Sequence, residues 1–122
     1  MTTQEVANRY SELEKQGKWT AIVDELYSDN VVSVEPAHGA EMGMPTLTTG
    51  LVAVKAKGAA FNENVAEMHG GYCTEPVVGG TYFSVGMGME VTFKGSPVRT
   101  KMDEIAVFEV KDGKITKEEF FY

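Results

Sequence analysis

The feature that most constrains the fold is strict alternation in the second half of the chain. From Thr81 to Phe93 apolar side chains occupy every second position, and the positions between them are small or polar. A period of two is typical of a β-strand with one buried face. Two further segments of this kind, Arg99 to Val110 and Lys114 to Tyr122, flank the turn signal Lys111-Asp112-Gly113. The second half therefore predicts an antiparallel sheet.

The first half has a helical period instead. A capping-box spacing at Thr2 to Glu5 precedes a predicted helix, whose inward face is Val6, Tyr10 and Leu13. After Gly17 a second helix carries its apolar stripe at Trp19, Ile22, Val23 and Leu26. Helices that precede strands in this way indicate an α+β fold, here expected as a single domain over residues 1–122.

Between these halves the pattern is less regular. A short strand, Val31 to Glu35, is stopped by Pro36, and a loop is expected over residues 37–49. A third helix is predicted from its stripe of apolar positions, Leu51, Val54, Phe61, Val65 and Met68. A weak strand is expected near Tyr72 to Val78.

Composition limits the classes of partner. The formal charge of -7 argues against nucleic acid and anionic membranes, and favours a neutral or cationic small molecule. Cys73 is the only cysteine, and no apolar run approaches the length of a membrane span. Without a signal-like segment at Met1, a cytoplasmic location is expected.

Acidic residues at two places suggest acid-base chemistry. Glu35 lies at a strand end, where a side chain can overhang a cavity, and Tyr10 is predicted to point inward from the first helix. Glu104 and Glu118 are expected on the apolar face of the last two strands, where burial would raise their pKa; if the register slips, Asp103 and Glu119 take their places. A phenol and several carboxylates are thus expected in the wall of one pocket.

The pairing of the last two strands depends on their turn. A three-residue turn with a left-handed Gly113 would set Ala106 opposite Glu118, Glu104 opposite Phe120 and Met102 opposite Tyr122. A two-residue turn would set Glu118 opposite Val107 instead. The sequence leaves both registers open.

The order of these elements, together with the motifs Gly-x-Trp, Leu-Tyr-Ser-Asp-Asn, Val-x-Val-Glu-Pro and Val-Phe-Glu-Val-Lys-Asp-Gly-Lys-Ile, resembles the SnoaL-like branch of the nuclear-transport-factor-2-like superfamily. The resemblance implies a cone-shaped α+β barrel, with three N-terminal helices packed in a strongly bent, mostly antiparallel sheet. It also implies a pocket at the open end and a homodimer through the outer sheet face. Function does not follow from this fold.

Ketosteroid isomerases of the same superfamily provide a comparison by residue. Their oxyanion tyrosine corresponds to Tyr10, which follows Arg9, and their general base corresponds to Glu35, which precedes Pro36. Their protonated aspartate corresponds to Ala106, so the resemblance implies that this donor is missing here. Polyketide cyclases of the SnoaL type also tend to carry an aspartate at this position, so Ala106 departs from both patterns. Either Glu104 or Glu118 is the candidate replacement acid.

The remaining candidates are side chains expected to line the pocket: Trp19, Phe61, His69, Met87, Met102, Phe108, Phe120 and Tyr122. For His69, capping of the third helix is the alternative interpretation. No metal or cofactor is expected, because His38 and His69 are far apart in sequence and no phosphate-binding glycine motif occurs.

Three functions are compatible with these observations. The first is a proton-transfer enzyme of the isomerase or cyclase type, acting on a small, largely apolar carbonyl compound, with Glu35 as base, Tyr10 as oxyanion donor and Glu118 or Glu104 as acid. The second is a non-catalytic module that binds an apolar ligand. The third is a dimerisation domain whose cone is filled by its own side chains.

Overall fold

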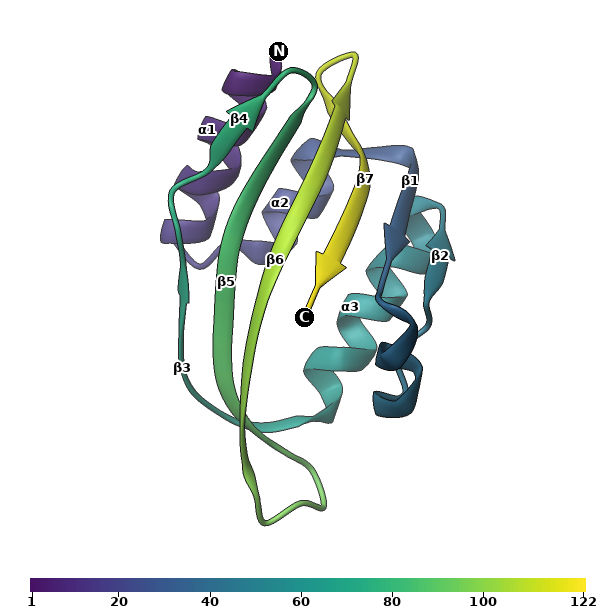
Figure 1. The fold of residues 1–122 in the computed structure, drawn as a ribbon, viewed down its shortest axis with the longest axis vertical. Helices are drawn as coiled ribbons and strands as arrows, with labels where there is room; N and C mark the ends of the chain where they lie inside the picture. The colour runs from purple at the N-terminus through teal and green to yellow at the C-terminus, as the bar shows by residue number, and fades with distance from the viewer.

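The computed structural model describes residues 1–122 and confirms the α+β class. Its elements, in chain order, are α1 (Thr3–Lys15), α2 (Trp19–Leu26), β1 (Tyr27–Val34), the 3-10 helix η1 (Ala37–Met42), β2 (Leu47–Thr49), α3 (Leu51–Asn64), β3 (Val65–Cys73), β4 (Val77–Gly79), β5 (Tyr82–Phe93), β6 (Arg99–Lys111) and β7 (Lys114–Phe121). The seven strands form one sheet in the order β2-β1-β7-β6-β5-β3, with β4 also paired to β5 (Figure 1). Only β1 and β7 run parallel.

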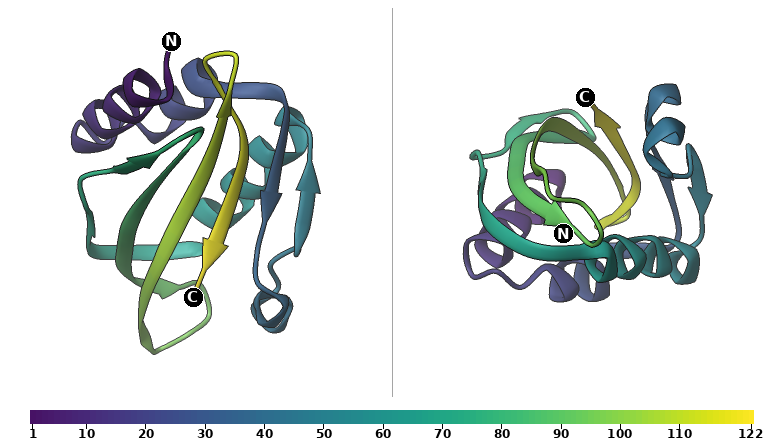
Figure 2. Two further views of the ribbon diagram at one scale, coloured as in Figure 1. Left: turned by 45° about the horizontal axis from the view of Figure 1, so that its top comes forward. Right: turned by 90° about the horizontal axis from the view of Figure 1, so that it is seen from below.

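The sheet is strongly bent. Seen from below, its strands follow an arc and α3 lies across the concave side, while α1 and α2 cover one end (Figure 2). This arrangement gives the cone a closed end beneath α1 and α2 and an open end near the C-terminus. No helix is long and apolar enough to cross a membrane.

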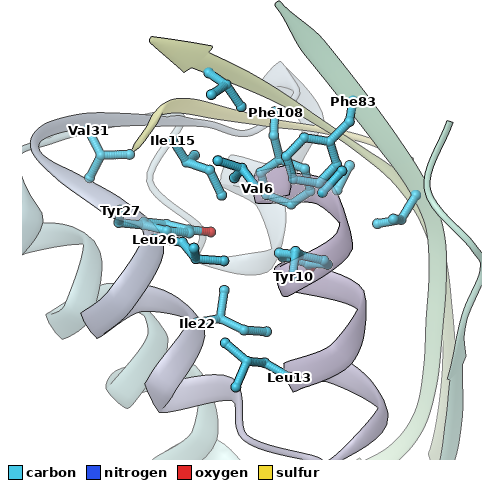
Figure 3. Packing of buried hydrophobic residues seen from close by; sticks show 14 of the residues in the cluster. Val6, Tyr10, Leu13, Ile22, Leu26, Tyr27, Val31, Phe83, Phe108 and Ile115 are labelled. Carbon is cyan, nitrogen blue, oxygen red and sulfur yellow. The ribbon is translucent and has the colours of Figure 1, made fainter. Parts of the chain in front are cut away.

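The hydrophobic core occupies the closed end. The predicted capping box is formed, since the Thr2 side chain accepts from the backbone of Glu5 and the Glu5 carboxylate accepts from the backbone of Thr2. The inward faces of α1 and α2 meet Phe83 and Phe108, whose rings stack with centroids 4.8 Å apart (Figure 3). Burial of this apolar surface is the main stabilising contribution at this end.

Several expected boundaries are wrong. The strand expected from Val31 begins at Tyr27, and the strand expected near Tyr72 to Val78 is divided between the end of β3 and β4. The third helix ends at Asn64, and Val65 and Met68 belong to β3, where they pair with Phe93 and Val91 of β5. Pairing with a long strand satisfies backbone groups all along β3, and this tertiary gain outweighs the helical period. The loop expected over residues 37–49 contains η1 and β2, and β2 pairs with the edge of β1.

The hairpin between β6 and β7 follows neither expected register. Lys111 pairs with Lys114 across a two-residue turn, in which Asp112 and Gly113 both have positive φ (52° and 76°). A register shift after Val110 then sets Glu118 opposite Phe108 and Phe120 opposite Ala106. The bulge adds one residue to β7. Because the side-chain period is two, that residue returns Glu118 to the inner face, as the three-residue turn would have done.

Candidate functional site

A hydrogen-bonded polar cluster lies on the inner face where β1 and β7 run side by side. Ser33 of β1 pairs with Glu118 of β7, and both are buried. The Ser33 hydroxyl donates to Glu118 Oε2 over 2.6 Å, and the Tyr27 hydroxyl donates to Glu118 Oε1. A buried carboxylate requires such donors, because burial without them is costly. Burial and the nearby Glu118 charge raise the pKa of Tyr27, which keeps the phenol neutral as a donor.

Lys57 of α3 extends this cluster to Glu35. Its Nζ lies 2.8 Å from Ser33 Oγ and 2.7 Å from Glu35 Oε2. The Lys57 and Glu35 side chains are only 9% and 4% exposed, so this is a buried ion pair. The ammonium group also lies 5.2 Å from the centroid of the Phe120 ring, a cation–π contact. Each member of the cluster is thus held by others from different elements.

Tyr122 closes the cluster at the open end. Its hydroxyl donates to Glu35 Oε1 over 2.8 Å, and its ring meets that of His38 edge-on at 5.3 Å. Gly39 is buried beside it, and a Cβ at Gly39 would lie 2.6 Å from the Tyr122 oxygen. A larger residue at this position would therefore displace the Tyr122 hydroxyl from its present place beside Glu35.

A cavity of about 190 Å³ adjoins the cluster, and its walls are Met42, Thr100, Lys101, Met102, Asp103, Glu104 and Tyr122. Partial burial raises the pKa of Glu104 to about 7, and the charges of Glu35 and Glu118 act in the same direction, whereas Lys57 opposes them. Glu104 therefore exchanges its proton near neutral pH, in a cavity large enough for a small ligand.

The structure places the four predicted chemical residues in two groups. Glu35, Glu104 and Glu118 come together at the open end. Tyr10 lies in the core, 5% exposed, with ring centroids 5.5 Å from Phe83 and 4.9 Å from Phe108 (Figure 3). The carboxylates of Glu35 and Glu118 accept from other groups, and Tyr10 is not among them. Tyr10 thus makes no hydrogen bond to either carboxylate, although burial and, to a smaller extent, nearby charges that include Glu118 and Glu104 raise its pKa.

Several predicted lining residues lie elsewhere. Trp19 is 57% exposed, because its indole turns outward to donate to Glu14. Phe61 packs on Phe93, and Phe108 belongs to the core.

Of the remaining lining candidates, some lie outside the cavity and two lie in its wall. His69 lies within β3, hydrogen-bonded to Thr92 over 2.8 Å, so it neither reaches the cavity nor caps α3. Met87 packs against the core margin, and Phe120 lies beneath the Lys57 ammonium group. Only Met102 and Tyr122 line the cavity itself.

Lys57, Ser33 and Tyr27 are the members of the cluster that the sequence analysis missed. Lys57 is three residues after Val54 and four before Phe61, so it lies on the predicted apolar stripe of the third helix. A charged residue on such a stripe is a signal that could have identified it. No group of three or more His, Cys, Asp or Glu side chains is arranged to hold a metal ion.

Comparison with known proteins identifies relatives along the whole chain. The model of the SnoaL-like domain family matches residues 1–122. A crystal structure from Mesorhizobium loti, whose name assigns it provisionally to the SnoaL-like polyketide cyclases and also carries the words carbohydrate phosphatase, is 35% identical over 100% of both chains, with a TM-score of 0.90. The comparison with curated proteins gives no match.

Two more distant structures contain small molecules and are similar in fold. TerC, co-crystallised with polyporic acid, is 19% identical over 98% of this chain and 90% of its own, with a TM-score of 0.74. A hypothetical protein from Catenulispora acidiphila with a ketosteroid isomerase-like fold, in complex with trimethylamine, is 15% identical over 84% of this chain and 72% of its own, with a TM-score of 0.67.

Proposed function

Because the chain belongs to the SnoaL-like domain family, we propose that it binds a small carbonyl compound at the open end of its cone and catalyses proton transfer on it. Glu104 carries this proposal. Its carboxyl group lines the cavity, its pKa is raised to about 7, and two other carboxylates are held nearby. A group that titrates near the working pH is suited to general acid-base catalysis. The small molecules held by TerC and by the Catenulispora protein support a ligand of this size class.

The cluster divides the chemistry between two carboxyl groups. Protonated Glu104 donates to the carbonyl oxygen, while Glu35, paired with Lys57 as a carboxylate, accepts a proton from the adjacent carbon. The Glu104 O–H and the carbon–hydrogen bond break as the enol O–H and the Glu35 O–H form, and the reverse step returns both protons. Tyr122 rather than Tyr10 is the phenol beside Glu35. Ala106 is fully buried beneath this region and offers no donor.

The test follows exchange of protons for deuterons at the carbons beside the carbonyl of cyclic ketones, with cyclohexanone as the first probe, by proton NMR in D2O. We expect the wild-type chain to accelerate exchange above the buffer rate. Glu104→Gln and Glu35→Gln are each expected to lower that rate by about 100-fold or more. Glu109→Gln is the matched control, since Glu109 shares strand β6 but bonds Tyr82 instead. Equal rates in all four proteins would contradict the proposal.

One observation favours a non-catalytic alternative. The Glu35 and Glu118 carboxylates already accept hydrogen bonds at both oxygens, and Tyr10 is not among the donors to them. A cluster of this kind would also serve to shape and orient a binding pocket. Ketone-induced shifts in the NMR signals of Met102 and Tyr122, without any accelerated exchange, would support this alternative.

The homodimer implied by the family resemblance is part of the proposal. Ile105 and Phe121 pair across β6 and β7 on the outer face, where they are 53% and 48% exposed. This apolar surface supports a second copy as partner, and the net charge of -7 argues against nucleic acid and anionic membranes as partners. Sedimentation equilibrium checks the dimer, and Ile105→Glu is expected to weaken it.

A further inference from the structure

The buried ammonium group of Lys57 bridges two carboxylates that the sequence places far apart. It contacts Glu35 Oε2 directly at 2.7 Å, and it donates over 2.8 Å to Ser33 Oγ, which donates in turn to Glu118 Oε2. The Ser33 hydroxyl thus accepts a hydrogen bond from Lys57 and donates its own proton to Glu118, so its orientation is fixed. Lys57 comes from α3, whereas Glu35 follows β1 and Glu118 lies on β7.

We propose that Lys57 is a positioning residue of this site, whose ammonium group joins Glu35 directly and Glu118 through Ser33, so that both carboxylates face Glu104 as one fixed unit. This inference rests on the proposed role of Glu104. Lys57 lies against the Phe120 ring and its side chain is 9% exposed, so water does not replace it easily. Its role is therefore to set the charge around Glu104 rather than to contact the ligand.

The charged and titratable groups around Glu104 come from several elements, and they include Tyr10 of α1, whose pKa is raised mainly by burial and in part by the Glu104 charge. Glu35 and Glu118 repel its negative form, Lys57 attracts it, and Tyr122 lies on the same cavity wall. Lys101 and Asp103 also line the cavity and carry opposite charges. Met87, the partner of Glu104 on β5, is uncharged. Lys57 is thus the one cation in the cluster that offsets two carboxylates.

The direction in which the pKa of Glu104 shifts on removal of Lys57 distinguishes a positioning role from simple packing. Removal of the Lys57 charge leaves Glu35 and Glu118 unopposed, so the pKa of Glu104 should rise further above its value of about 7. If Lys57 only packed the cluster together, its removal would admit water and bring the pKa of Glu104 down toward the ordinary carboxyl range. The two roles therefore predict shifts in opposite directions.

The experiment is a carbon-13 NMR titration of the Glu104 carboxyl group in the ligand-free protein. Lys57→Met is expected to raise its pKa by roughly half to one pH unit. Lys57→Arg keeps the charge and should leave the pKa close to the wild-type value. Lys55→Met is the matched control, because Lys55 lies on the same helix but pairs with Asp24 at the surface. An unchanged or lowered pKa in folded Lys57→Met would overturn the inference.

A second measurement needs no variant, in case Lys57→Met does not fold. The nitrogen-15 signal of Lys57 Nζ in the wild-type protein should show a step at the pH where Glu104 titrates. Its absence would also overturn the inference. A lack of ketone exchange, in contrast, would overturn the proposed function without changing the titrations of Glu104 and Lys57. Failure of the proposed function can therefore be distinguished from failure of the inference about Lys57.

Discussion

The two ends of the cone are built on the same strands but are stabilised in different ways. At the closed end Tyr10, Phe83 and Phe108 pack ring against ring, without charged groups among them. At the open end Glu35 and Glu118 are equally buried but are held by hydrogen bonds and by the Lys57 ion pair. The boundary is sharp, because Phe108 and Glu118 are direct partners across β6 and β7.

This difference shows what each end requires of its residues. Apolar burial depends on filled volume and has little directionality, so the closed end depends on the size of its side chains. Burial of charge is unfavourable unless every group is paired, so the open end depends on the chemical identity of each partner. A tyrosine therefore has a packing role at one end and a hydrogen-bonding role at the other.

The largest effect is expected from truncation of the closed end. Phe108→Ala should lower the free energy of unfolding by about 3–5 kcal/mol, because it removes a fully buried ring and leaves a cavity. Urea unfolding followed by circular dichroism measures this loss. Val52→Ala is the control at an 85% exposed position of α3 and should change the free energy by less than about 0.5 kcal/mol. Similar losses in both variants would show that the closed end is not a packed core.

An intermediate effect is expected from pH at the open end. The pKa of Glu104 is about 7 in the folded protein and close to its ordinary value of 4.5 in the unfolded chain. Between these values the folded protein binds more protons, so the free energy of unfolding should fall as pH rises through the window and level off above it. We expect a loss on the order of 1 to 3 kcal/mol relative to Glu104→Gln, measured by urea unfolding at several pH values. If the free energy of unfolding changed with pH in the same way in the wild type and in Glu104→Gln, the raised pKa of Glu104 would be contradicted.

The smallest effects distinguish the two tyrosines. Tyr122→Phe removes the hydrogen bond to the Glu35 carboxylate and should lower the free energy of unfolding by about 1 to 2 kcal/mol. Tyr10→Phe should change it by less than about 0.5 kcal/mol, because the ring contacts with Phe83 and Phe108 remain. Thermal and urea unfolding of both variants, with ketone exchange as a second readout, make the comparison. A larger effect of Tyr10→Phe on exchange would return the isomerase-like role to Tyr10.

Local patterns predicted much of the fold. The capping box, the α2 boundaries and the alternation of β5 are all present as expected, because each depends on neighbouring residues in the chain. The end of α3 was not predictable in this way. Its last expected turn pairs with β5, a strand later in sequence, and that pairing overrides the local period.

The candidate site was predicted only in part. Glu35 could be identified from its place at a strand end and Glu104 from strand alternation, whereas the inward face of Glu118 depended on a hairpin register that the sequence left open. The sequence could not predict that Lys57 contacts these carboxylates, because a helical period does not show which strands the helix will pack against. The choice between Tyr10 and Tyr122 likewise depended on the depth of each residue in the cone, which is a property of the assembled layers.

The sequence by itself therefore determined the class of the fold, its two halves and the apolar face of the long strand β5, since these follow from periods of two and 3.6 residues. Tertiary structure alone decided the hairpin register, through the bulge in β7, and the membership of the polar cluster. The physical reason is range: hydrophobic periodicity acts between near neighbours, whereas a buried charge is stabilised only by whichever partner the packed elements bring within hydrogen-bond distance.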